Sequence, residues 1–112
     1  MRRLVFGFIV ASFVVSALAS AETWNSLPLV DKMCVEKVKS DPDKHETRCL
    51  INCAKSGYGV LMSDGTWVAF DSKGNQEALE ALKATKKTEG IRVTVTGERK
   101  GDTIQVSTLT ID

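Results

Sequence analysis

The sequence has few of the residues on which most catalytic motifs depend. It contains one histidine, three cysteines and two prolines. A single histidine with no nucleophile motif beside it argues against a Ser–His–Asp triad, and no glycine-rich phosphate-binding loop is present in the sequence. The acidic residues are scattered, so no pair of catalytic carboxylates can be singled out. We therefore expect a protein that is not an enzyme.

An excess of charge of one sign is also lacking. The chain carries 15 lysines and arginines against 14 aspartates and glutamates. Such an even balance offers nothing that would attract nucleic acid or an anionic membrane surface. We expect no nucleic-acid partner.

The chain has no apolar run long enough to span a bilayer, but its N-terminus has the pattern of a secretory signal peptide. Arg2 and Arg3 precede a mostly apolar run over residues 4–19, which is shorter than the ~20 residues that a spanning helix needs. Small residues at positions 19–21 predict cleavage before Glu22. Residues 1–21 would then be removed. The remaining single domain, residues 22–112, would be periplasmic or secreted, with no stable membrane anchor.

The segments that follow predict a mainly β fold with two helices. Extended segments are expected over residues 22–35, 58–62, 66–70, 91–96 and from 104 onwards, and helices over residues 41–55 and after a turn at 71–74. Gly57 is expected to end the first helix, and Asn75 to cap the second. A turn is expected over residues 98–102.

With the first helix set aside, the order of elements is that of an OB-like five-stranded barrel. The cysteine-bearing helix is then an insertion between strands 1 and 2. An open α+β sheet with both helices on one face is the alternative. In the last strand, Ile104 and Val106 alternate in one phase and Leu109 and Ile111 in the other, which predicts a bulge or sharp bend near Ser107-Thr108.

The three cysteines and the histidine lie close together in the sequence, as Cys34, His45, Cys49 and Cys53. Thiolates and imidazole suit a soft or borderline ion, Cu(I) or Zn(II). Residues four apart on a helix share a face at about 6 Å along the axis, and residues eight apart are separated by about 12 Å. One ion can therefore take two neighbouring helix residues together with Cys34. All four residues could bind it only if the helix breaks or begins after His45.

A disulfide is the alternative reading of the same segment. Export places the cysteines in an oxidising compartment, where Cys34 could pair with Cys49 or Cys53. Closing a loop of this length stabilises a domain by about 3 kcal/mol. The protein would then be a binding module for an envelope partner, with the disulfide as a staple that fastens the insertion to the barrel. A thiol-redox role is a further alternative, although C-x-x-x-C is not the C-x-x-C of thioredoxin-like motifs.

The pattern resembles a family of small, uncharacterised, secreted bacterial proteins. The matching stretches are V-D-x-x-C at 30–34, H-x-x-x-C-x-x-x-C-A-K-x-G at 45–57, D-G at 64–65 and V-T-V-T-G at 93–97. The resemblance implies an OB-like fold and draws attention to the same cysteines and histidine, but it implies no activity. We therefore expect a small exported domain that binds copper or zinc at Cys34, His45, Cys49 and Cys53.

Overall fold

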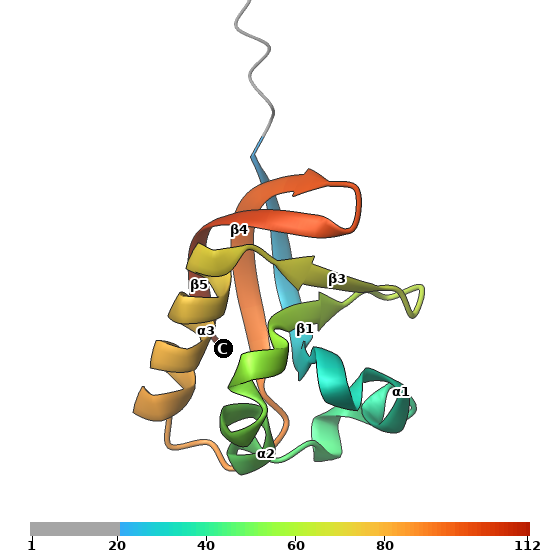
Figure 1. The fold of residues 1–112 in the computed structure, drawn as a ribbon, viewed down its shortest axis with the longest axis vertical. Helices are drawn as coiled ribbons and strands as arrows, with labels where there is room; N and C mark the ends of the chain where they lie inside the picture. The colour runs from blue at the N-terminus through green and yellow to red at the C-terminus, as the bar shows by residue number, and fades with distance from the viewer. Residues whose placement is uncertain (1–20) are drawn as a thin grey trace, which may run out of the picture.

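The computed structural model describes residues 21–112, and it shows a closed barrel (Figure 1). The strands are β1 (Glu22–Asp31), β2 (Tyr58–Leu61), β3 (Trp67–Phe70), β4 (Arg92–Lys100) and β5 (Thr103–Ile111). Their order around the barrel is β1-β2-β3-β5-β4, and β1 also pairs with β4. The pairs are antiparallel except for β3 with β5. The OB-like barrel is confirmed, and the open α+β sheet is wrong.

The predicted signal peptide lies outside the described residues, apart from Ala21. Strand β1 begins at Glu22, the residue after the predicted cleavage point. Cleavage there stays a prediction.

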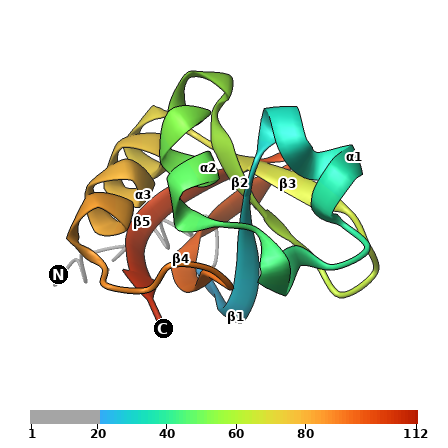
Figure 2. The same cartoon turned by 90° about the horizontal axis from the view of Figure 1, so that it is seen from below.

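Short helical segments fill the connection between β1 and β2, and a longer helix joins β3 to β4. The segments of the connection are η1 (Lys32–Cys34), α1 (Val35–Val38), η2 (Pro42–Lys44), α2 (Thr47–Asn52) and η3 (Ala54–Ser56); the longer helix is α3 (Ser72–Ala84). Seen from below, α2 lies beside α3, whereas α1 lies farther from it (Figure 2). The insertion therefore covers one end of the barrel and reaches the long helix.

The core follows the alternation expected of barrel strands. In β4, Val93 and Val95 are fully buried, whereas Arg92, Thr94 and Thr96, which alternate with them, are only half-buried. Helix α3 contributes Ala78 and Leu82 to the same core. Each large apolar side chain that is fully buried stabilises the fold by roughly 1.5–3 kcal/mol. This core holds the end of β1, from which the candidate site begins.

The prediction of one helix over residues 41–55 is wrong. The chain forms η2, leaves helical geometry at His45 (φ −71°, ψ 124°), and then forms α2 and η3. A distant segment causes the break, because the Thr47 amide donates to the Thr88 carbonyl (2.8 Å) and the Gly90 amide donates to the His45 carbonyl (3.3 Å). Gly57 does end the last helical turn, with φ 88°.

The predicted start of the second helix is also wrong. Helix α3 begins at Ser72, and its cap is Asp71, whose Oδ1 accepts from the Gly74 amide at 2.9 Å. Asn75 lies within the helix, and its Oδ1 accepts from the Tyr58 amide at 2.8 Å. The side chain that was expected to cap α3 therefore connects it to the start of β2.

The last hairpin differs from the prediction at its turn and agrees with it at the bulge. Strand β4 continues to Lys100, so the turn is shorter than the predicted 98–102. Thr96 pairs with Thr108 and Gly97 with Val106, which leaves Ser107 as an extra residue in β5. The predicted bulge is confirmed.

Candidate metal centre

The site begins with a buried carboxylate at the end of β1. Asp31 pairs with Tyr58 across the β1–β2 ladder and is 0 % exposed. Its Oδ1 accepts a hydrogen bond from His45 Nε2 at 2.9 Å, and His45 is itself buried. Among residues 21–112, Oδ2 has no hydrogen-bond partner. A buried carboxylate oxygen with no partner is costly, so this position favours a cation.

Two thiols lie next to this carboxylate. Cys34 ends η1, three residues after Asp31, and Cys53 connects α2 to η3. The ligand atoms of these three residues all lie within 4.8 Å of one another. Two thiolates bound to a tetrahedral zinc ion lie about 3.8 Å apart, given Zn–S bonds of about 2.3 Å. A small closing movement would bring the group to metal-binding geometry, so Asp31, Cys34 and Cys53 form a candidate metal-binding group.

Hydrogen bonds hold the two cysteine-bearing segments together. The Lys32 amide donates to the Gly57 carbonyl at 2.9 Å. The Met33 amide donates to Ser56 Oγ at 3.3 Å, and the Ser56 hydroxyl donates to the Cys53 carbonyl at 2.8 Å. The backbone that carries Cys34 is thus tied to the backbone that carries Cys53. Such support from neighbouring groups preorganises a binding site.

The electrostatics of the group also favour a cation. Burial first, and then the adjacent Asp31 carboxylate and Cys53, raise the pKa of Cys34 to about 12. The Cys34 thiol is close enough to Asp31 to have this effect, but it makes no hydrogen bond of good geometry to Oδ2. Without a metal, Cys34 is a neutral thiol at neutral pH. A bound cation has the opposite effect on the protonation of Cys34, because a thiol that coordinates a metal ion is deprotonated.

The same pKa shift disfavours the thiol-redox alternative for Cys34. A reactive thiol needs a lowered pKa, whereas the surroundings of Cys34 raise its pKa.

Tyr58 is affected by the same neighbours as Cys34. Burial first, and then Asp31 and Cys53, raise the pKa of Tyr58 to about 12.

The structure brings together two of the residues predicted from the sequence, Cys34 and Cys53, and adds Asp31. His45 contacts the group through Asp31. Cys49 lies one helical turn before Cys53 and is not part of the group. All three cysteines lie in the described part of the chain and are free, so neither of the predicted disulfides is present.

Sequence reasoning missed Asp31, although one signal for it exists. It follows the apolar residues Leu29 and Val30 directly and precedes Cys34 by three positions. A carboxylate at the end of a buried strand and near a cysteine is unusual, because aspartate is seldom fully buried without a partner.

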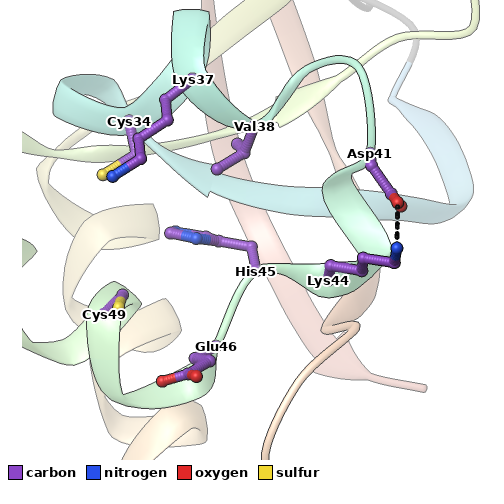
Figure 3. Close-up of a pocket in the computed structure, with 8 residues that line it drawn as sticks. All are labelled: Cys34, Lys37, Val38, Asp41, Lys44, His45, Glu46 and Cys49. Atoms are coloured by element: carbon purple, nitrogen blue, oxygen red, sulfur yellow. Dashed lines mark ion pairs between the residues drawn. The ribbon is translucent and has the colours of Figure 1, made fainter.

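A pocket of about 380 Å³ opens beside the group. It is lined by Cys34, Lys37, Val38, Asp41, Lys44, His45, Glu46 and Cys49. In Figure 3, Cys34 and Cys49 lie on opposite sides of the His45 ring, and the Asp41–Lys44 ion pair (3.3 Å) lies at the far rim. Cys34 therefore belongs both to the metal-binding group and to the wall of this pocket.

No family model matches the chain, and no curated protein or solved structure is significantly similar to it. The resemblance to small secreted bacterial proteins accordingly stays a prediction. Within residues 21–112, no helix is long and apolar enough to cross a membrane.

Proposed function

We propose that the protein is a small exported, non-enzymatic domain that binds one transition-metal ion through Asp31, Cys34 and Cys53. The observation that carries the proposal is the buried Asp31 Oδ2, which has no partner among residues 21–112 and lies beside two free thiols. The proposal places the protein in the periplasm or outside the cell, in keeping with the leader pattern of its sequence.

The donor set favours Zn(II) over Cu(I). Zinc accepts both thiolate and carboxylate ligands, whereas Cu(I) is selected by soft sulfur ligands. A divalent ion also balances the negative charge of two thiolates and a carboxylate better than a monovalent ion does. With three protein ligands, one position of a tetrahedral ion stays open to water or another exogenous ligand.

His45 acts on the metal through Asp31. Its Nε2–H donates to Oδ1 of Asp31, which fixes the carboxylate and leaves Oδ2 to meet the ion. Partners of this kind orient a ligand, and their loss typically lowers metal affinity by about 10–100-fold. His45 is therefore a positioning residue in this proposal.

The test is zinc binding by the reduced protein, measured by calorimetry and by native mass spectrometry. We expect one Zn(II) per chain, and Co(II) in the same site should show thiolate-to-metal charge-transfer absorption. Cys53→Ser should weaken binding by at least about 100-fold, because it removes a ligand.

Cys49→Ser is the matched control. It removes a half-buried thiol from the same helical segment, one turn away and outside the group. It should leave the zinc Kd within about two-fold of the wild-type value. Absence of stoichiometric uptake by the wild-type protein, or equal losses in the two serine variants, would refute the proposal.

A disulfide-stapled binding module for an envelope partner is the second candidate. The observation that favours it is that Cys34 Sγ and Cys53 Sγ lie within 4.8 Å of each other, in a protein that we expect to be exported. The intact mass of the denatured protein, purified without reductant and alkylated, shows whether the staple is present. A mass lower by two hydrogens with a single alkylated cysteine supports the staple, and three alkylated cysteines exclude it.

A further inference from the structure

The pocket beside the metal-binding group contains a thiol that the group does not use. Cys49 lines this pocket together with Cys34 and His45. The Cys53 amide donates to the Cys49 carbonyl at 3.1 Å, so the two cysteines are one helical turn apart. Residues at this spacing lie on the same side of a helix, about 6 Å apart along its axis. Cys49 is thus the nearest thiol outside the group along α2, and it faces the pocket.

We propose that this pocket is the route by which the metal ion enters and leaves, with Cys49 as a relay ligand. The inference rests on the proposed function. Cys34 is common to the group and to the pocket wall, so it can hold the ion while the second sulfur changes. In the resting site the second sulfur ligand is Cys53. Cys49 replaces Cys53 as the ion moves toward the pocket.

The relay is a ligand exchange without a change of oxidation state. Cys49 loses its proton as its sulfur bonds to the ion, and Cys53 takes up a proton as its own bond to the ion breaks. An incoming thiolate or chelator then forms the next bond to the metal in the pocket. The bond from Asp31 Oδ2 to the ion breaks as the ion moves into the pocket. Cys34 and Cys49 are then released in turn, each taking up a proton from the solvent, and the ion leaves with the acceptor.

The charges around the pocket indicate the kind of acceptor. Lys44 is paired with Asp41, and Glu46 with Arg48. Lys37 lines the pocket, and no ion pair of it is found among residues 21–112. The volume of about 380 Å³ is near the lower end of small-molecule sites. The acceptor that fits is a small anionic thiol or chelator.

The experiment is transfer of Zn(II) from the loaded protein to an excess of the anionic chelator 4-(2-pyridylazo)resorcinol, followed by stopped-flow absorbance. We expect Cys49→Ser to lower the transfer rate at least ten-fold while the equilibrium zinc Kd stays within two-fold of the wild-type value. Val38→Thr is the control, because it changes a pocket residue to one of nearly the same shape without adding or removing a thiol. Its rate should equal that of the wild type.

Two outcomes would overturn the inference. An unchanged rate in Cys49→Ser would mean that Cys49 takes no part in transfer, and it would leave the proposed function intact. A loss of equilibrium affinity as large as that of Cys53→Ser would make Cys49 a resting ligand instead of a relay, and it would overturn the proposed ligand set as well. Failure of the wild-type protein to hold zinc would overturn both proposals, and equilibrium titration detects it before any rate is measured.

Discussion

Asp31 carries a cost in the metal-free protein that metal binding would relieve. Its carboxylate is 0 % exposed, and one of its oxygens has no partner among residues 21–112. Asp31→Asn removes the buried charge and still offers an oxygen to His45. We expect the metal-free variant to be more stable than wild type by about 1 kcal/mol, since a buried carboxylate charge with one unbonded oxygen is lost. Zinc binding should be abolished in the same variant.

Urea unfolding with and without zinc measures both effects of Asp31→Asn. The control is Asp102→Asn, which changes an exposed aspartate in the β4–β5 turn and should alter neither quantity. Destabilisation of the metal-free Asp31→Asn protein by several kcal/mol would mean that the carboxylate is a structural element of the fold and not a preformed ligand.

Tyr58 reports the electrostatics of the site through its own titration. It is the only tyrosine, and its hydroxyl donates to the buried Leu50 carbonyl at 2.6 Å. Burial first, and then Asp31 and Cys53, raise its pKa from 10.0 to about 12. The raised pKa means that the folded state holds the proton more tightly than the unfolded state. The stability that Tyr58 contributes is complete below pH 10 and is lost as the pH rises toward 12.

The prediction for Tyr58 is checked by ultraviolet absorbance of tyrosinate. In the metal-free protein we expect the midpoint near pH 12. Bound zinc should lower this midpoint, because the cation offsets the charges of Asp31 and Cys53. A metal-free midpoint near 10 would show that the ring is exposed in solution and that the insertion does not cover it.

At the scale of the elements, Asp71 connects α3 to the barrel. Its Oδ1 accepts from the Gly74 amide at 2.9 Å, which caps the helix, and from the Val106 amide in β5 at 3.2 Å. We expect Asp71→Ala to lower the free energy of unfolding by about 1–3 kcal/mol, because a cap is lost and a partly buried amide loses its acceptor. Thermal unfolding measures this loss. A change below about 0.5 kcal/mol would mean that water replaces both bonds.

The elements that the sequence predicts well are those defined by local chemistry. The phase change between Val106 and Leu109 was enough to predict an irregularity near Ser107-Thr108, where the structure has its bulge, because a strand alternates with a period of two. The break at His45 could not be predicted in this way. It depends on hydrogen bonds to Thr88 and Gly90, more than 40 positions away, whereas the Asp41-Pro42 start signal is local and favours a helix.

The candidate site was predictable only in part, because local sequence patterns point to some of its residues and distant contacts select the others. The spacing of Cys34 and Cys53 within a short segment pointed to a shared site, and the structure brings their sulfur atoms close. Cys49 and Cys53 lie four residues apart in the same segment, and the path of the insertion decides which of them meets Asp31. That path is set by contacts between η1, η3 and the end of β1, which no local pattern encodes.

For the whole molecule, the metal ion would tie the insertion to the barrel. Asp31 belongs to β1, whereas Cys34 and Cys53 belong to the insertion, so one ion would join three points of the chain. Zinc at 100 times its Kd should add about 2.7 kcal/mol to the free energy of unfolding. For a domain of this size that corresponds to a rise in Tm of roughly 10–20 °C.

The location of this stabilisation distinguishes a specific site from general binding. Opening of the insertion exposes the site without unfolding the barrel, so zinc should slow amide exchange most at Lys32, Cys53 and Gly57. The β4–β5 hairpin should change less, because its ladder forms independently of the insertion. Cys34→Ser should show neither the rise in Tm nor the local protection. Uniform protection across the barrel in that variant would mean that zinc binds elsewhere, and that Asp31 and the two thiols are not its ligands.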